Sequence, residues 1–295
     1  MIVNPYALSL KTVMLKVTKN ISAARFFAYK IRHMQYKKIT DNFSDSPKIF
    51  RDIEIETINR CNFNCPFCPV NRSLDPRKLH KMEESLFNKI INDLNLLNFD
   101  GRVALHSNNE PFIDERIESF AEIARRELPN AFIHLYTNGS LLTVERLQKI
   151  INNINGIIID NYNDDLQMTE QVKIIHDFCI GRPEINSKVT ICLRKQNEVL
   201  TTRGGQAPNN EMRKTISLKC IFPWTQFVVR PTGKVSLCCN DATGKYTMGD
   251  LTTQSPTEVW RSKEYRDFRK RMNEQGRKGT ALCEFCDSHG LISKF

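Results

Sequence analysis

Residues 60–69 of the chain read Arg-Cys-Asn-Phe-Asn-Cys-Pro-Phe-Cys-Pro, which places Cys61, Cys65 and Cys68 at a CxxxCxxC spacing. The segment follows a predicted strand and is expected to form a loop. Three neighbouring thiolates suit an iron–sulfur cluster in which one iron has no protein ligand, because zinc ribbons and bacterial ferredoxins use other spacings and mostly four ligands. The alternative is a zinc site completed by a distant histidine. An open iron would give a small molecule a place to bind and react.

The length and composition of the whole chain limit the kinds of protein that it can be. A chain of 295 residues predicts one full domain and a smaller one, and its 40% hydrophobic and 26% charged residues are typical of globular proteins. No apolar run reaches the ~18 residues that span a membrane, and no secretory signal is evident. Five of the ten cysteines lie in a CxxxCxxC group and a CxxC group. This pattern favours metal ligation in a reducing, cytoplasmic compartment over disulfides.

The positive charge is concentrated at the N-terminus. Residues 1–40 hold eight Lys or Arg and no acidic residue, so they carry eight of the ten net positive charges. The rest of the chain is nearly balanced, which argues against a nucleic-acid-binding surface over the whole protein. Apolar residues between 21 and 34 recur at helical spacing. We expect a basic amphipathic extension over residues 1–48 that packs on the main domain, contacts an anionic membrane surface peripherally, or docks a partner.

The middle of the chain alternates between strand and helix patterns. Strands are expected at residues 53–58, 102–106, 131–136, 156–160 and 188–193, and helices at 82–97, 114–128, 141–151 and 169–179. Strict alternation predicts a parallel sheet with right-handed crossovers. We therefore predict an α/β fold, a partial (open) parallel β/α barrel of about five or six strands over residues 49–212.

Polar residues follow several of the predicted strands. They are the cysteine loop, Ser107-Asn108-Asn109-Glu110-Pro111, Thr137-Asn138-Gly139 and Asp160-Asn161. The carboxyl ends of parallel strands form the usual functional edge of α/β folds. The sequence thus predicts a site at that edge.

These residues resemble the radical S-adenosylmethionine enzymes. Cys61, Cys65, Phe67 and Cys68 match that family's CxxxCxΦC signature after the first strand. Asn108-Asn109-Glu110-Pro111 stands where the family has a Gly-Gly-Glu-Pro segment, with both glycines replaced. Residues 136–140 look like the family's third-strand turn. The order of these motifs, each after a successive strand, makes the combination specific.

The resemblance implies a cofactor and a chemistry. S-adenosyl-L-methionine would chelate the open iron of a [4Fe–4S] cluster, and an electron from a donor such as flavodoxin or ferredoxin would release a 5′-deoxyadenosyl radical that abstracts hydrogen from a C–H bond. The residues expected to bind the cofactor are Glu110, Asn109, Thr137, Asn138, Gly139 and Arg194. Glu110 would bind the methionine amino group, and Arg194 its carboxylate; a solvated strand-end charge is the alternative for Arg194.

Residues 213–295 have their own cysteine framework. Cys220 precedes a predicted β-hairpin at residues 226–238, a helix at 255–272, and a CxxC at residues 283–286. The arrangement resembles the SPASM auxiliary-cluster domain in its shortened "twitch" form. That resemblance implies a second [4Fe–4S] cluster with four protein ligands, Cys220, Cys238, Cys283 and Cys286. A zinc site is the alternative for these four.

The remaining cysteines and Asp241 leave several roles open. Cys179 and Cys192 are expected in the core. Cys239 is a core thiol, a spare ligand, or a hydrogen-atom donor to a substrate radical. Asp241 is a catalytic base, a substrate ligand, or a turn-forming residue.

The closest resemblance within the family is to its aminocyclitol dehydrogenase type. In that type an Arg before the first auxiliary cysteine contacts the reacting hydroxyl, and Arg203 stands at the corresponding distance before Cys220. A free guanidinium stays protonated, so Arg203 is expected to orient and acidify the hydroxyl. We therefore predict oxidation of a sugar, cyclitol or similar small molecule from alcohol to ketone, with Arg203, Asp241 and Cys239 as candidate catalytic residues. Radical epimerisation or thioether cross-linking of a ribosomally made peptide is the second hypothesis, and a non-enzymatic zinc or nucleic-acid-binding protein the third.

Overall fold

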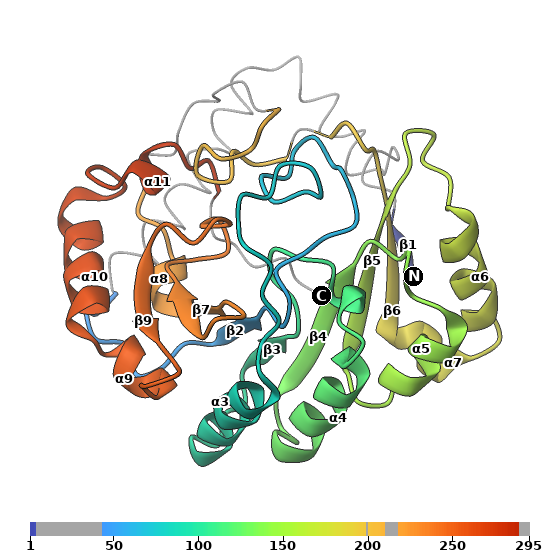
Figure 1. Ribbon diagram of the computed structural model, residues 1–295, viewed down its shortest axis with the longest axis horizontal. Helices are drawn as coiled ribbons and strands as arrows, with labels where there is room; N and C mark the ends of the chain where they lie inside the picture. The colour runs from blue at the N-terminus through green and yellow to red at the C-terminus, as the bar shows by residue number, and fades with distance from the viewer. Residues whose placement is uncertain (4–42, 199, 210–217, 289–295) are drawn as a thin grey trace, which may run out of the picture.

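The computed structural model describes residues 1–3, 43–198, 200–209 and 218–288 (Figure 1). Most of the basic N-terminal extension predicted for residues 1–48 lies outside the described residues. No helix within the described ranges is both long and apolar enough to cross a membrane.

Five parallel strands form the centre of the fold. They are β2 (Asp52–Ile55), β3 (Arg102–Ala104), β4 (Phe132–Thr137), β5 (Gly156–Tyr162) and β6 (Val189–Arg194), and each pairs with the next in chain order. The sheet curves but does not close (Figure 1). The predicted partial barrel is confirmed, and each of its strands is present to within a few residues of the expected bounds.

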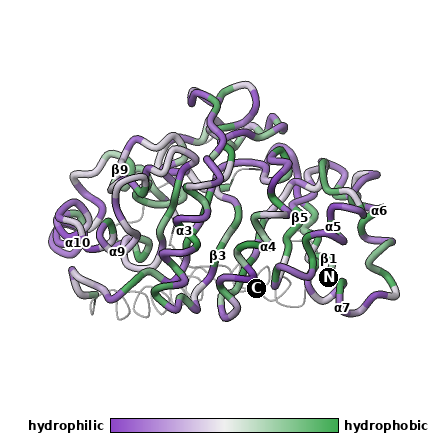
Figure 2. Tube along the Cα trace, turned by 60° about the horizontal axis from the view of Figure 1, so that its bottom comes forward, coloured by the Kyte–Doolittle hydropathy of each residue, from purple (hydrophilic) through white to green (hydrophobic). Residues whose placement is uncertain are grey.

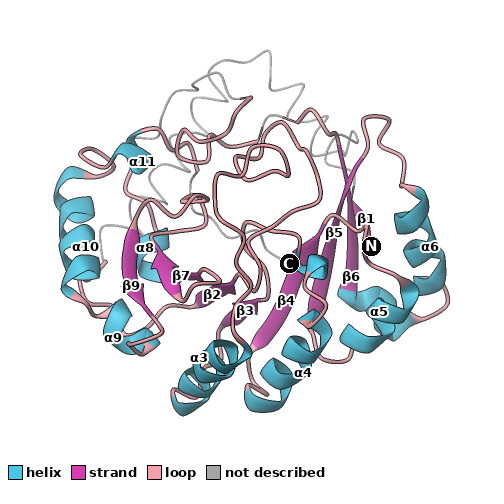
Figure 3. Ribbon diagram, viewed as in Figure 1, coloured by secondary structure: helices cyan, strands magenta, loops and turns pink. Residues whose placement is uncertain are grey.

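Helices cover the outer face of this sheet. They are α3 (Glu84–Leu96), α4 (Ile117–Glu127), α5 (Val144–Ile150), α6 (Glu170–Cys179) and the short α7 (Pro183–Lys188) (Figure 3). The sequence analysis predicted the first four and missed α7, whose six residues bury no side chain. In Figure 2 the apolar β5 contrasts with hydrophilic helices at the surface such as α10.

Side-chain alternation separates the two faces of the sheet. Ile53 and Ile55 of β2, like Ile133 and Leu135 of β4, are fully buried in the hydrophobic core. Because successive side chains of a strand point to opposite faces, the residues between them point to the concave face. These intervening residues are polar or ionisable, for example Glu54 and His134. The core therefore lies between sheet and helices, and the concave face is left for chemistry.

The C-terminal part continues the same sheet. β7 (Gln226–Val229) pairs in parallel with β2 and forms the predicted hairpin with β8 (Lys234–Ser236), to which β9 (Thr247–Asp250) adds in antiparallel. Gly233 makes the hairpin turn with φ of 82°, a left-handed conformation that favours glycine. At the opposite edge β1 (Ile2–Val3) pairs with β6. The order is β1-β6-β5-β4-β3-β2-β7-β8-β9.

The single helix predicted for residues 255–272 is two helices. α9 (Pro256–Trp260) and α10 (Lys263–Gln275) are separated at Arg261 and Ser262. Each helix has its own N-cap, because the Ser255 side chain accepts a hydrogen bond from Glu258 N and the Ser262 side chain accepts one from Tyr265 N. The short α8 (Phe222–Thr225) follows Cys220, and α11 (Ala281–Glu284) carries the first cysteine of the CxxC.

Candidate active site

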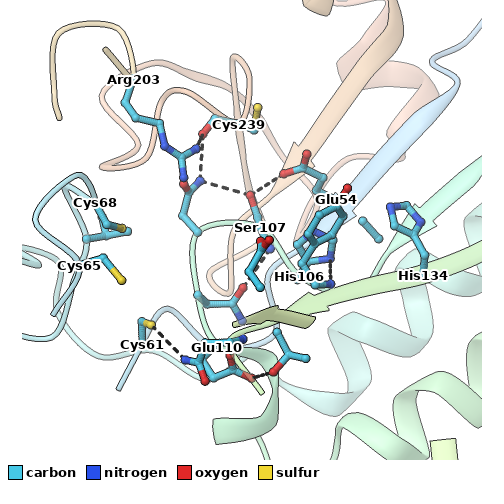
Figure 4. Close-up of a pocket in the computed structure, with 18 of the residues that line it drawn as sticks. Glu54, Cys61, Cys65, Cys68, His106, Ser107, Glu110, His134, Arg203 and Cys239 are labelled. Carbon is cyan, nitrogen blue, oxygen red and sulfur yellow. Dashed lines mark hydrogen bonds between the residues drawn. The ribbon is translucent and has the colours of Figure 1, made fainter. Parts of the chain in front are cut away.

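A cavity of about 390 Å³ opens at the carboxyl ends of the parallel strands. Its lining includes all three cysteines of the residue 60–69 loop, side chains from the concave faces of β2 to β5, and Arg203 and Cys239 from the C-terminal side. Figure 4 shows the loop cysteines at one side of this space and Arg203 with Cys239 at another, while Glu54 and Ser107 lie between them towards the strands. The residues of the predicted functional edge thus line one open cavity.

Hydrogen bonds within residues 60–72 hold the cysteine loop in its conformation. Cys68 N donates to Cys65 O at 3.0 Å, and Asn71 Nδ2 donates to the same oxygen at 3.0 Å. Burial, together with the neighbouring Cys61 and Cys68, raises the pKa of Cys65 to about 12. Thiolates this close together gain from a cationic iron cluster, which neutralises their charge. The donor set therefore fits the cluster that the motif predicts.

Glu110 joins the Glu-Pro segment to the turn after β4. Its carboxylate accepts hydrogen bonds from Thr137 Oγ1 at 2.7 Å, Asn138 N at 2.7 Å and Phe112 N at 3.1 Å. Glu110 N in turn donates to Arg60 O at 2.8 Å, which ties this segment to the cysteine loop. Burial raises the pKa of Glu110 to about 7. Three motifs from separate strands therefore meet at one carboxylate.

The two asparagines in place of the family's glycines make specific contacts. Asn109 Oδ1 accepts a hydrogen bond from Ser107 N at 2.9 Å, and Asn108 Nδ2 donates to Cys239 O at 3.1 Å. Asn138 Nδ2 donates to Asn62 Oδ1 at 2.8 Å and lies 4.0 Å from Cys61 Sγ. Asn109, Thr137 and Asn138 all line the cavity beside the cysteines.

Three predicted site residues lie elsewhere. Arg194 pairs with Asp160 at 2.7 Å and with Glu198 at 3.1 Å, and it is absent from the cavity lining. Gly139 shapes the turn behind the lining, with φ of 78°. Asp241 is buried, and its two carboxylate oxygens accept from Lys245 N at 2.8 Å and Tyr246 N at 2.9 Å. The structure gives Asp241 the turn-forming role, and Arg194 that of an ion-paired strand end.

The four cysteines of the C-terminal framework come together. All four are buried, with exposed fractions between 6% and 8%. Burial and the neighbouring thiols, including Cys220, Cys283 and Cys286, hold the pKa of Cys238 well above its usual value. Asn240 Nδ2 approaches Cys286 Sγ at 3.9 Å. This buried, all-sulfur donor set fits a cluster with four protein ligands.

The thiol spacing bears on the zinc alternative. Within the described residues, no three Cys, His, Asp or Glu side chains form a group that could hold one metal ion. The thiolates of a four-iron cluster each bind a different iron, so they stand farther apart than the ligands of a single zinc ion. The two kinds of site therefore require different spacings of the cysteines.

Arg203 lies on a loop that is anchored to the CxxC segment. Thr202 N donates to Asp287 Oδ1 at 2.7 Å, and Thr202 Oγ1 donates to Phe285 O at 2.6 Å. Arg203 itself has φ of 50°, a conformation that costs a non-glycine residue roughly 1–2 kcal/mol. Its Nη1 donates to Cys239 O at 3.5 Å. The fold thus holds a strained arginine in the wall of the cavity, on a loop tied to the CxxC segment.

The site contains residues that the sequence analysis did not select. Glu54 projects from β2 into the cavity, where it accepts hydrogen bonds from Ser107 Oγ at 2.6 Å and Gln226 Nε2 at 2.7 Å. Burial raises the pKa of Glu54 to about 7. His106 and His134 line the same wall, and burial lowers the pKa of both. Strand alternation places Glu54 and His134 on the concave face, and that was the available signal.

Comparisons with known proteins agree with this geometry. A family model of the Radical SAM superfamily matches residues 55–185, and a model of an iron–sulfur cluster-binding domain, SPASM, matches residues 220–287. The chain is 28% identical over 243 residues to the S-adenosyl-L-methionine-dependent 2-deoxy-scyllo-inosamine dehydrogenase of Niallia circulans. That match covers 82% of this chain and 94% of the relative.

Solved structures show the same architecture. BtrN in complex with AdoMet and 2-DOIA superposes with a TM-score of 0.71 at 27% identity, covering 82% of this chain and 94% of BtrN. BtrN in an open conformation gives a TM-score of 0.61 at 24% identity, with the same coverage. A more distant structure, anSMEcpe with bound AdoMet, shares the fold at a TM-score of 0.52 and 14% identity, covering 80% of this chain and 85% of that one.

The two matched domains confirm the predicted cofactors, S-adenosylmethionine and two iron–sulfur clusters, and the dehydrogenase relative confirms the enzyme class. Residues 55–185 therefore form a radical S-adenosylmethionine domain, and residues 220–287 form an iron–sulfur cluster-binding domain of the SPASM type.

Proposed function

We propose that this protein oxidises a secondary alcohol of an aminocyclitol, or of a similarly polar cyclic small molecule, to a ketone. The observation that carries the proposal is the position of Arg203, which lines the same cavity as the cysteines of the first cluster and lies on a loop anchored to the CxxC segment of the second. A relative of this chain is named as a 2-deoxy-scyllo-inosamine dehydrogenase. BtrN, whose structure is similar to that of this chain, was solved in complex with 2-DOIA. Both names describe a small aminocyclitol.

Different residues of the chain would bind the first cluster, the cofactor and the substrate hydroxyl. S-adenosylmethionine, bound at the first cluster and reduced by one electron, supplies the abstraction of a hydrogen atom from a C–H bond. Cys61, Cys65 and Cys68 would hold that cluster, and Glu110 and Asn138 would contact the methionine end of the cofactor. Arg203 would donate hydrogen bonds to the substrate hydroxyl and lower its pKa, because a cation nearby favours the alkoxide.

The C-terminal cysteines supply the oxidising step. Cys220, Cys238, Cys283 and Cys286 would hold a cluster that takes one electron from the substrate, which completes the change from alcohol to ketone. An acidic electron carrier such as a flavodoxin or ferredoxin would supply the electron for the first cluster. Modification of a ribosomally made peptide is the weaker hypothesis, because the named relative acts on a small molecule.

Anaerobic turnover tests this proposal. The reconstituted protein is incubated with S-adenosylmethionine, a reductant and either 2-deoxy-scyllo-inosamine or related cyclitols deuterated at each carbinol carbon. We expect one ketone per 5′-deoxyadenosine, and deuterium in 5′-deoxyadenosine from a single carbon. Formation of an epimer or a cross-linked product, or no ketone from any cyclitol, would contradict the proposal.

Arg203 is tested by substitution. Arg203→Ala should lower ketone formation at least about 100-fold, because it removes the group that orients the hydroxyl, and Arg203→Lys should recover only part of the rate because the bidentate fork is lost. Arg126→Ala, at an exposed position on α4, is the matched control and should behave as wild type. Undiminished turnover of Arg203→Ala would remove the proposed role.

A further inference from the structure

We propose that Glu54 is the proton acceptor of this reaction, taking the hydroxyl proton of the substrate either directly or through the hydroxyl of Ser107. The inference rests on the proposed oxidation of an alcohol, because that reaction releases a proton which none of the assigned residues accepts.

The balance of the reaction defines what is missing. Conversion of CH–OH to C=O removes one hydrogen atom, one proton and one electron from the substrate. The cofactor, when bound, would take the hydrogen atom, and a cluster held by Cys220, Cys238, Cys283 and Cys286 would take the electron. Arg203 cannot accept the proton, because its guanidinium is already protonated at neutral pH. A base with a free lone pair is therefore required near the hydroxyl.

Four carboxylates line the cavity, and their partners differ. Asp52 pairs with Arg102 at 3.4 Å, and Asp160 pairs with Arg194 at 2.7 Å. Burial raises the pKa of both carboxyls, and the cationic partner opposes that rise and occupies a carboxylate oxygen of each. Glu110 is engaged by three hydrogen bonds at the turn that faces the first cluster. These three carboxylates are therefore committed to other contacts.

Glu54 is different because both of its hydrogen-bond donors are neutral. Ser107 Oγ donates to Oε2 at 2.6 Å, and Gln226 Nε2 donates to Oε1 at 2.7 Å. Each carboxylate oxygen keeps a second lone pair for a proton. Burial raises the pKa of Glu54 to about 7, which matches the strength of a base that works at neutral pH. Ser107 can pass on a proton, since its hydroxyl donates to Glu54 while accepting from the substrate.

A continuous hydrogen-bond network connects Glu54 to Arg203. Asn108 Nδ2 donates to Ser107 Oγ at 3.3 Å and to Cys239 O at 3.1 Å, and the same Cys239 oxygen accepts from Arg203 at 3.5 Å. Gln226 adds a second connection between Glu54 and Cys239, because its Nε2 donates to Glu54 and its Oε1 accepts a hydrogen bond from Cys239 N at 3.0 Å. Figure 4 shows this network along one wall of the cavity. A substrate hydroxyl beside it can accept from Arg203 and donate towards Ser107 and Glu54.

The other charged groups around Glu54 do not replace it. Arg203 lowers its pKa and Asp52 raises it, while both effects are smaller than that of burial. Cys239 faces Glu54 from the C-terminal side, and burial raises the pKa of its thiol to about 12, so it stays neutral. Burial lowers the pKa of His134 to about 3 and that of His106 well below its usual value. Both histidines are therefore neutral and weakly basic at pH 7.

The decisive variant is Glu54→Gln, which keeps the shape of the side chain and removes the base. We expect 5′-deoxyadenosine formation to persist while ketone formation falls about 100-fold or more, so that the ratio of the two products departs from one. The wild-type rate should fall on the acid side of about pH 7, where Glu54 is protonated, and this limb should disappear in the residual activity of the variant. Glu122→Gln, exposed on α4, is the control and should keep both the ratio and the limb.

A second measurement needs no turnover. Infrared titration of the protein without substrate should show protonated carboxyl bands that are lost as the pH rises through about 7, and Glu54→Gln should remove the share of one carboxyl while leaving those of Glu56 and Glu110. Ser107→Ala, which leaves the carboxylate in place, should lower ketone formation less than Glu54→Gln does. If Glu54→Gln does not fold, the wild-type titration and Ser107→Ala decide the matter.

The outcomes separate this inference from the proposed function. A product ratio of one and an unchanged pH limb in Glu54→Gln would overturn the role of Glu54 and leave the alcohol oxidation standing. A wild-type protein that forms no ketone would instead overturn the proposed function. A Glu54 carboxyl that remains ionised down to about pH 5 would also overturn the inference, because a base must bind its proton near working pH.

Discussion

At the scale of single residues, the local motifs could be predicted from the sequence. The hydrogen-bond and ion-pair partners of individual side chains could not. The cysteines and Glu110 are recognisable because their spacing and order along the chain carry the signal. Arg194 and Asp241 were assigned to chemistry, but their partners, Asp160 and the backbone of residues 245–246, are set by tertiary contacts that no local pattern encodes. Glu54 was missed because alternation shows which residues share a face, and only the packed structure shows which face lines the cavity.

The raised pKa of Glu54 has a measurable effect on stability. Its pKa is about 7 in the folded chain and 4.5 for a freely exposed Glu side chain, so the folded state holds a proton that the unfolded state releases between these values. Stability from this group is present below about pH 4.5 and is lost as the pH rises through about 7. The free energy of unfolding of wild type, relative to Glu54→Gln, should therefore decrease by roughly 2–3 kcal/mol between about pH 5 and about pH 8. Urea unfolding of both proteins at a series of pH values measures it, and a difference that rises with pH would contradict the assigned direction.

At the scale of elements, the alternating strands and helices were predictable because each needs only a local apolar period. The ends of the helices were harder to predict. Ser255 and Ser262 each cap a helix, but the apolar pattern runs on through both helices and gave no sign of the break between α9 and α10. The pairing of β1 with β6 joins two residues to a strand nearly 190 positions away, and a two-residue strand has no periodicity to detect. The parallel pairing of β7 with β2 was likewise invisible, because a hairpin pattern gives no information on its neighbour.

The two cysteine elements should lose iron independently. Reconstituted wild type should contain about eight irons, and Cys65→Ser or Cys283→Ser about four each, because each substitution removes a ligand from a different cluster. Cys239→Ser is the matched control and should keep about eight, since we assign the neighbouring Cys238 as the ligand. Iron and sulfide analysis with electron paramagnetic resonance measures this. Loss of iron in Cys239→Ser would show that Cys239 is a ligand, and zinc in place of iron would contradict the cluster assignment.

At the scale of the whole molecule, the domain boundary proposed near residue 212 crosses a shared sheet. The fold class could be predicted from the sequence, because the alternation of strands and helices and the cysteine groups can each be read within one region of the chain. That the two regions share hydrogen bonds through β2 and β7 did not follow, since sheet order depends on contacts far apart in the chain. The domain limits themselves remain predictions.

A shared sheet predicts cooperative unfolding. Both tryptophans, Trp224 and Trp260, lie in the C-terminal region, whereas most of the helices and strands lie in the barrel. Tryptophan fluorescence and far-ultraviolet circular dichroism should therefore give coincident urea transitions in the holoprotein. Phe227→Ala in β7, which removes a fully buried ring, should move both transitions to lower urea together. Transitions that separate would show that the two regions unfold as independent domains.

The anchoring of Arg203 also determines when the site can be completed during synthesis. The loop is tied by Thr202 to Asp287, 85 positions further along the chain. The strands and motifs that we assign to cofactor binding all precede residue 195, so they leave the ribosome before that anchor exists. The half of the molecule that makes a radical is therefore translated first, and the half that directs the radical to a substrate is fixed only when the distant aspartate emerges.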